Sequence, residues 1–333
     1  MRDMGSLEGK KILFFSQFFF GYENKIAQAM RDEGAYVQVC DEMSVKSSYE
    51  RAFLKINPHI FDKKTERYFL DLLEKLSNTN FDFVLFIDGE MVTKKILKMY
   101  RKAFPNAKFC LHLWDSVRNL KGVDKVFSFF DFITSFDSED CKKYKLKFRP
   151  LFFCDEYRNI ESDNKSYDFV FIGTIHSDRY KVIKKLKDSL DEKYQNFYYL
   201  FLQNKFIYYF YKLTKEEFRG TKIDDFAFEK LQSSEIADIV SKAKYIIDIQ
   251  HPLQTGLTMR TLEMIGMKRK LVTTNVHIME YDFYRPSNIQ VINRENPTIS
   301  DKFLDSDYED LSKGIYEKYS IKSWIYDVLG IRE

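Results

Sequence analysis

The chain has 333 residues, of which 44% are hydrophobic and 17% are aromatic. A chain of this length and composition can bury large hydrophobic cores, and its length predicts two globular domains. Its 53 basic and 50 acidic side chains give a net charge of +3, which is too balanced to predict nucleic-acid binding.

The cysteines and the hydropathy of the chain indicate its compartment. Cys40, Cys110, Cys141 and Cys154 show no C-x-x-C spacing, and several of them fall in predicted strands. We interpret them as reduced, buried side chains of a cytosolic protein, not as zinc ligands or disulfides. No stretch reaches 18 consecutive apolar residues, and the N-terminus lacks an apolar signal region. We therefore expect a cytoplasmic chain that is not exported and does not span a membrane.

Apolar strands alternate with amphipathic helices through the first half of the chain. Strands are predicted at 11–16, 36–40, 81–87, 108–114 and 132–135, and helices at 23–33, 64–76, 94–104 and 138–144. This alternation predicts an α/β fold with a doubly wound parallel sheet. We assign residues 1–150 to a first Rossmann-like domain.

A polar, irregular segment at 151–166 predicts a linker, after which the alternation resumes. Strands are predicted at 167–172, 198–202, 245–249, 271–274 and 289–292, and helices after Arg179, at 226–243, from 259, at 308–319 and at 322–329. We assign 167–306 to a second Rossmann-like domain and 307–333 to closing helices.

The stretch from His251 to Asn275 is the most informative part of the sequence. It lies between two apolar strands, its loop contains Gly256, and Thr258 stands where a helix N-cap is expected. This order brings backbone N–H groups and a helix N-terminus to the carboxyl edge of a parallel sheet. Many α/β proteins bind phosphate at such an edge.

Arg260 and Glu263 interrupt the apolar pattern of this helix and are neighbours three residues apart. One interpretation is an ordinary salt bridge on a solvated helix face, worth roughly 0.2–0.5 kcal/mol. In the other, the guanidinium binds a diphosphate and the carboxylate binds the two hydroxyls of a ribose. The second interpretation predicts a nucleoside diphosphate site.

The segment Gly256-Leu-Thr-Met-Arg-Thr-Leu-Glu-Met-Ile-Gly266, followed by Lys270-Leu-Val-Thr-Thr-Asn275, resembles the donor-binding signature of GT-B glycosyltransferases. It is similar to the Arg-Thr-Phe-Glu-Ala-type helix of spore-maturation-type and polysaccharide or lipopolysaccharide biosynthesis enzymes. The resemblance implies two Rossmann-like domains that face a central cleft, with the last helix returning to the first domain and Trp324 as its anchor. It implies a nucleotide-sugar donor held by Thr255, Gly256, Leu257, Thr258, Arg260 and Glu263. Many GT-B enzymes carry a second glutamate where this chain has Thr255.

The resemblance extends to the start of the second domain. Gly173 and Arg179 flank the loop after the first predicted strand, and we expect them to approach the phosphates, although a glycine there is also typical of a plain turn. Helix amides and arginines would stabilise the leaving diphosphate, so we expect no metal and no cofactor. Asp305-Ser-Asp307 has the spacing of a sugar-nucleotide metal motif, but we interpret it as a solvated turn.

Two aspartates are candidates for the catalytic base. Asp88 and Asp115 each follow a predicted strand, where a carboxylate can remove the proton of an acceptor hydroxyl. We expect Asp115 to be the base, because His112-Leu-Trp-Asp115 resembles the acceptor-domain signature of the family, with Asp88 second and Glu23 third. A helix cap explains each aspartate equally well. An imidazole from His112 or His251 could serve as the base instead, although a lone histidine beside apolar residues is more often a structural group. His277 follows a predicted strand, and its position alone places it at the border of the nucleotide site.

Residues 179–222 carry eleven basic and five acidic side chains, and the aromatic runs interleaved with them form an aromatic and basic segment at 193–222. Such a segment either contacts a membrane surface or packs its aromatic side chains inward. We expect inward packing, since aromatic residues are mostly found in cores.

The sequence therefore predicts a glycosyltransferase that moves a sugar from a nucleoside-diphosphate sugar to a hydroxyl of a surface polysaccharide, a lipopolysaccharide or another glycan. Two different functions fit the same scaffold, a sugar-nucleotide epimerase and a non-catalytic assembly subunit that binds nucleotide sugars. A nicotinamide-dependent enzyme is disfavoured, because Gly21 and Gly173 lack the rest of a G-x-G-x-x-G turn.

Overall fold

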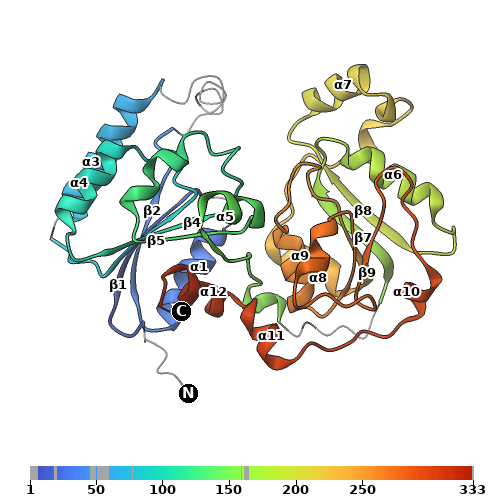
Figure 1. The fold of residues 1–333 in the computed structure, drawn as a ribbon. Coiled ribbons are helices and arrows are strands. Elements are labelled where there is room, and N and C mark those ends of the chain that lie inside the picture. Colours follow the sequence, from blue (N-terminus) through green and yellow to red (C-terminus); the bar gives the residue numbers. More distant parts are fainter. Residues whose placement is uncertain are drawn as a thin grey trace. The chain divides into compact units, whose positions relative to one another are not determined.

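A computed structural model describes residues 7–18, 21–45, 50, 60–76, 78–158, 160 and 165–331. The chain forms two compact units, the first from Met1–Leu151 with Ile321–Glu333 and the second from Phe152–Ser320 (Figure 1). Among the described residues, no helix is both long and apolar enough to cross a membrane.

The first unit is built on a six-stranded parallel sheet with the strand order β2-β1-β3-β4-β5-β6. Its strands are β1 (Lys11–Ser16), β2 (Tyr36–Asp41), β3 (Phe83–Ile87), β4 (Lys108–Leu113), β5 (Phe132–Ser135) and β6 (Lys147–Phe148). Its helices are α1 (Tyr22–Asp32), α3 (Asp62–Leu76), α4 (Lys94–Ala103), α5 (Ser138–Tyr144), α12 (Ile321–Val328) and the 3₁₀ helix η1 (Val123–Phe129).

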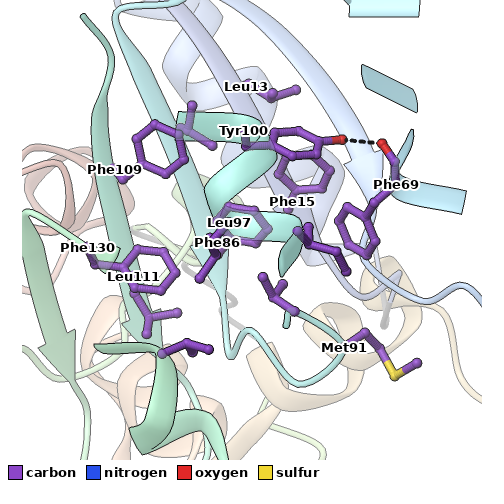
Figure 2. Close-up of a cluster of buried hydrophobic side chains, with 14 of the residues drawn as sticks. Leu13, Phe15, Phe69, Phe86, Met91, Leu97, Tyr100, Phe109, Leu111 and Phe130 are labelled. Atoms are coloured by element: carbon purple, nitrogen blue, oxygen red, sulfur yellow. Dashed lines mark hydrogen bonds between the residues drawn. The ribbon is translucent and has the colours of Figure 1, made fainter. Parts of the chain in front are cut away.

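Aromatic side chains fill the core between the sheet and α3 and α4. Phe15 of β1 stacks on Phe86 of β3 with 4.5 Å between ring centroids. Tyr100 of α4 is fully buried, and its hydroxyl donates to the backbone oxygen of Phe69 in α3 at 2.9 Å (Figure 2). The Tyr100 hydroxyl is the polar group among these rings, and this hydrogen bond satisfies it. Its burial in the aromatic core therefore leaves no unsatisfied donor.

The last helix, α12, packs in the first unit although it follows the whole second unit in sequence. Trp324 is fully buried with its ring edge-on to His112, 5.0 Å between centroids. The Asp327 carboxylate pairs with the buried Arg149 guanidinium at 2.8 Å. A buried cation needs such a partner, so α12 completes this unit both by packing and by charge.

The second unit contains a five-stranded parallel sheet with the order β11-β10-β9-β7-β8. Its strands are β7 (Tyr167–Thr174), β8 (Asn196–Phe201), β9 (Ala243–Asp248), β10 (Lys270–Thr273) and β11 (Ile289–Val291). Its α-helices are α6 (Arg179–Ser189), α7 (Lys205–Thr214), α8 (Ser233–Ser241), α9 (Met259–Gly266), α10 (Asp301–Asp305) and α11 (Lys313–Lys318). Its 3₁₀ helices are η2 (Asp155–Tyr157), η3 (Glu216–Phe218), η4 (Ile223–Asp225) and η5 (Val276–Glu280).

The predicted α/β class with two doubly wound parallel sheets is confirmed. Three local predictions differ from the structure. The segment predicted as a linker at 151–166 begins with buried Phe152 and Phe153, which pack in the second unit. The helix predicted at 226–243 begins only at Ser233, because Ala227 instead pairs with β8, its N–H donating to Leu200 at 2.9 Å. The closing helix predicted at 308–319 spans only Lys313–Lys318.

The aromatic side chains of α7 do not all pack inward as we expected. Tyr208 is buried, whereas Phe206, Tyr209 and Phe210 are exposed. The aromatic side chains of α7 therefore lie on two faces of the helix, and only one of these faces packs in the core.

Each sheet reverses its strand order at one point, between β1 and β3 in the first unit and between β7 and β9 in the second. At such a point the loops at the carboxyl ends of the two strands diverge and leave a crevice, where open α/β sheets bind ligands. The fold thus places candidate sites after β1 and β3 and after β7 and β9.

Two helical glycines provide a matched test of the packing in the second unit. A Cβ added at Gly266 of α9 would lie 2.7 Å from the ring of Phe153, whereas a Cβ at Gly314 of α11 meets no described atom within 4 Å. We expect Gly266→Ala to lower the free energy of unfolding by about 1–3 kcal/mol through overpacking. Gly314→Ala should raise it by about 0.4–1 kcal/mol, since alanine restricts the unfolded chain. Chemical denaturation of both variants measures the difference, and equal effects would contradict this packing.

Candidate donor and catalytic sites

The start of α9 is fixed by a buried carboxylate at the end of β9. Thr258 is the N-cap, and its hydroxyl accepts from the Thr261 N–H at 3.3 Å. The hydroxyls of Thr258 and Thr261 both donate to Oδ2 of Asp248, at 2.6 Å and 2.8 Å. This arrangement leaves the helix N-terminus at the carboxyl edge of the sheet, as the sequence predicted, and N–H groups at a helix N-terminus bind anions.

The loop between β9 and α9 is held by side chains from three other segments. Arg179 donates to the Ile249 oxygen at 2.6 Å, and Arg294 donates to the Gln250 oxygen at 2.7 Å. Asn275 donates to the oxygens of Thr255 and Gly256 at 3.1 Å and 3.3 Å. The loop is therefore anchored at both ends before any ligand binds.

The roles of Arg294 and Asn275 were not predicted from the sequence. Asn275 was visible as the end of the signature segment, and its position after a strand was the only available signal. Nothing in the local sequence around Arg294 links it to the loop, since the two lie together only because β11 and β9 belong to one sheet.

Gly173 lies near the end of β7, and Arg179 is the first residue of α6. The Arg179 guanidinium donates to the backbone oxygens of Thr174 and Ile249, both at 2.6 Å, so it joins the ends of β7 and β9. Burial lowers the pKa of Arg179, and the nearby Asp248 carboxylate opposes that shift. Gly173 lies within β7, paired with β8, and not in the turn after the strand. A Cβ there would lie 2.9 Å from the Phe171 ring, so close packing explains the glycine.

Thr255 and Leu257 lie in the loop between β9 and α9. The Leu257 side chain is buried, and so is the Thr255 hydroxyl, which has no hydrogen-bond partner among the described residues. A buried hydroxyl without a partner costs about 1–3 kcal/mol.

Arg260 and Glu263 form the predicted pair, but not on a solvated face. Arg260 Nη1 lies 2.6 Å from Glu263 Oε2, and the two side chains are 16% and 3% exposed. Glu263 also lies beside Tyr157 of η2. Burial raises the pKa of the Tyr157 hydroxyl, and the Glu263 carboxylate raises it further. The carboxylate is thus held between a cation and a phenol inside the second unit.

Asp88, at the end of β3, has the electrostatics of a base near neutral pH. Its backbone is left-handed with φ 66°, and its Oδ1 accepts from the N–H groups of Trp114 and Asp115 at 2.6 Å and 3.0 Å. Burial raises the pKa of Asp88 to about 7; the Trp114 N–H opposes this shift, and the Asp115 charge adds to it. A carboxyl with such a pKa exchanges a proton readily at physiological pH.

The Asp115 side chain forms hydrogen bonds within its own turn. Its Oδ1 accepts from the Ser116 N–H at 2.7 Å and from Asn119 Nδ2 at 2.9 Å. This is the capping geometry that we considered as the second explanation for each aspartate. The structure brings Asp88 and Asp115 together, with the first carboxylate accepting from the N–H of the second residue.

The histidines and Glu23 lie in less reactive surroundings. His112 is fully buried, its Nδ1 lies 2.8 Å from the Thr134 hydroxyl, and burial lowers its pKa to about 3. Glu23 is buried at the start of α1, where it accepts from Asn24 at 2.9 Å. His277 lies 3.1 Å from Glu280, and the exposed His251 ring lies 5.8 Å from that of His176.

A pocket of about 320 Å³ opens at the carboxyl edge of β3 in the first unit. Glu90 and Met91 line it, together with Lys94 at the start of α4, Lys121 in the loop before η1 and Lys125 within η1. Among the described residues, no group of three histidine, cysteine or carboxylate side chains is arranged to hold a metal ion.

No family profile and no curated protein matches the sequence. Solved structures do match it over nearly its whole length. Sucrose-phosphate synthase from Thermosynechococcus elongatus has a TM-score of 0.57 at 9% identity and covers 96% of this chain and 95% of its own. A glycosyltransferase from Rickettsia africae has a TM-score of 0.56 at 14% identity, with 97% and 95% covered. Anabaena HepE in complex with UDP-glucose has a TM-score of 0.51 at 11% identity, with 96% of each chain covered.

The chain has a GT-B fold of two Rossmann-like units. This confirms the fold that the resemblance of the donor helix implied. Identities this low establish the fold alone, so the activity has to be argued from the residues of each unit.

The electrostatics of Asp88 predict a pH dependence of stability. Because its pKa is raised from 3.8 to about 7 on folding, the folded state favours the protonated carboxyl. Its contribution is fully present below about pH 3.8 and is lost as the pH rises through about 7. Asp88→Asn retains an acceptor oxygen and a residue type that tolerates positive φ. Denaturation between pH 4 and pH 8 should show a smaller decline for Asp88→Asn than for the parent chain; parallel curves would contradict the raised pKa.

Proposed function

We propose that the protein is a glycosyltransferase that transfers a sugar from a nucleoside-diphosphate sugar to a hydroxyl group of a glycan. The observation that carries this proposal is the start of α9, where a capped helix N-terminus, an anchored loop and the Arg260–Glu263 pair lie together. The GT-B fold and the UDP-glucose bound by the structurally similar HepE support it.

In the proposed donor complex, the N–H groups of the loop from Thr255 to Thr258 bind the diphosphate together with Arg260. The Glu263 carboxylate then exchanges part of its contact with Arg260 for the two hydroxyls of the ribose. Arg179 acts indirectly on the donor, because its guanidinium holds the backbone of the loop after β9. Gly173 permits the close packing of β7 beside Arg179, since an added Cβ would lie 2.9 Å from the Phe171 ring.

The proposed reaction is displacement at the anomeric carbon of the sugar. The acceptor oxygen forms the new bond to that carbon while the bond to the diphosphate oxygen breaks. Negative charge develops on the leaving diphosphate, where fixed N–H dipoles and a guanidinium stabilise it. This scheme uses no metal and no cofactor, and the acceptor proton passes to a base.

We propose Asp88 as that base, ahead of Asp115. Its raised pKa allows it to accept a proton near pH 7, whereas Asp115 is engaged by two hydrogen bonds in its own turn. The pocket beside Glu90 and Lys94 at the same strand end is our candidate for acceptor binding. A growing surface polysaccharide or lipopolysaccharide, as in the spore-maturation-type and related enzymes, is the acceptor class we propose, with transfer of a hexose in the cytoplasm.

The first test concerns donor binding. Glu263→Gln and Arg260→Gln should each weaken UDP binding by roughly 10- to 100-fold, since each removes a charged hydrogen-bonding partner. Isothermal titration with UDP and UDP-glucose, well below the melting temperature, separates binding from stability. Glu139→Gln removes an exposed i,i+3 partner of Lys142 and is the matched control, with unchanged affinity expected. Full affinity in both site variants would refute the assignment.

The second test concerns the base. Asp88→Asn should lower kcat by roughly 10²–10⁴-fold without weakening UDP binding, because it removes proton transfer alone. Asp115→Asn should cost less, as its amide oxygen still accepts the hydrogen bonds of the turn. Initial rates with a glycan acceptor across pH 5–9 measure both, and a larger loss for Asp115→Asn would reverse the ranking.

A further inference from the structure

Helix α7 carries an exposed apolar stripe. Phe206, Tyr209, Phe210 and Leu213 are 78%, 55%, 53% and 87% exposed. Their spacing of i, i+3, i+4 and i+7 places all four on one face of the helix. In Figure 1 this helix lies at one end of the second unit, beyond the end of the sheet.

The opposite face of α7 already fills the core of the second unit. Tyr208 is 1% exposed, its ring lies 5.4 Å from that of Phe226, and its hydroxyl donates to the Thr221 oxygen at 2.9 Å. The Tyr211 ring lies 5.2 Å from Phe218. The exposed stripe is therefore additional to what folding needs, and an exposed contiguous apolar patch marks an interaction surface.

The charge around the stripe is positive. On the helix, Lys205 and Lys212 lie along one border of the stripe, and α7 contains no acidic residue. From Lys205 to Lys222 there are five basic and two acidic side chains, a net charge of +3. The two acids, Glu216 and Glu217, follow the helix in η3. Aromatic side chains beside lysines are typical of helices that lie in the interface of an anionic membrane.

The size of the stripe favours a lipid surface over a protein partner. Four such side chains at these exposures offer roughly 500 Å² of apolar area, below the about 800 Å² per partner of a stable protein interface. A bilayer needs no matching surface, because aromatic and leucine side chains enter the acyl boundary while lysines remain at the headgroups.

We propose that α7 is an interfacial helix that binds the second unit to a membrane containing anionic lipid. The Lys215 amine, just after the helix, donates to the Ser177 oxygen at 2.6 Å. This bond links the helix to the loop after β7, at the edge of the sheet where the proposed donor site lies. A membrane bound through α7 therefore lies beside that edge, so the inference extends to lipid-linked acceptors, while the binding itself stands without the proposed function.

The experiment is sedimentation of the full chain with vesicles of phosphatidylcholine alone or with 30% phosphatidylglycerol. Binding to the anionic vesicles is expected, with little binding to neutral ones and a decline as salt rises. The double variant Phe206→Ser/Leu213→Ser should bind the anionic vesicles at least about tenfold more weakly, since two inserted apolar side chains are removed. Leu70→Ser, which changes a 42% exposed leucine on α3, is the matched control and should bind as the parent does.

Circular dichroism of each variant confirms that the fold is kept, since all three side chains are exposed. Failure of the parent chain to bind anionic vesicles would overturn the proposal. Equal binding by the double variant would overturn it as well. A third contrary result is a parent chain that does not bind vesicles but self-associates, with the double variant abolishing that self-association. None of these readouts uses a sugar nucleotide, so they are independent of the tests of donor binding.

Discussion

The candidate donor site depends on the two hydrogen bonds that the Asp248 carboxylate, at the end of β9, accepts from hydroxyl groups. This buried carboxylate fixes Thr258 and Thr261, and through them the first turn of α9. Buried polar groups are stable only when their hydrogen bonds are satisfied, so the position of this helix N-terminus is strongly determined. Arg179, Arg294 and Asn275 fix the preceding loop in the same way, through its backbone oxygens. An anion that binds there meets N–H groups that are already oriented, and little ordering is required at binding.

The Arg260–Glu263 pair follows from this rigid start and has a different energetic character. A nearly buried ion pair contributes little net stability, because desolvation of both charges offsets their attraction. Such a pair is nevertheless a ready binding device. When a ligand binds, its diphosphate can pair with the Arg260 guanidinium and its ribose hydroxyls can donate to the Glu263 carboxylate. Neither buried charge is then left without a partner. The Tyr157 hydroxyl interacts with the Glu263 carboxylate as well.

Much of the architecture could be predicted from sequence, because strands buried on both faces are nearly continuous apolar runs and Thr258 is a strong N-cap signal. The pairing of Arg260 with Glu263 could also be predicted from their spacing. The burial of that pair could not, since it depends on η2, which lies about a hundred residues away. The role of Arg294 likewise arises from a contact between segments distant in sequence. The raised pKa of Asp88 arises from its burial in the folded first unit. Which aromatic side chains of α7 face inward could not be predicted either, because it depends on where Phe218 and Phe226 pack.

The central claim is that the Glu263 carboxylate binds the ribose of a nucleoside diphosphate, and hydroxyl deletion in the ligand tests it most directly. The measurement is a cycle of four affinities, for UDP and 2′,3′-dideoxy-UDP with the parent chain and with Glu263→Gln. If Glu263 binds the hydroxyls, their removal should weaken binding to the parent chain by roughly tenfold or more and should have little further effect on the variant. The same loss for both proteins would show that the ribose is bound elsewhere and would contradict the account.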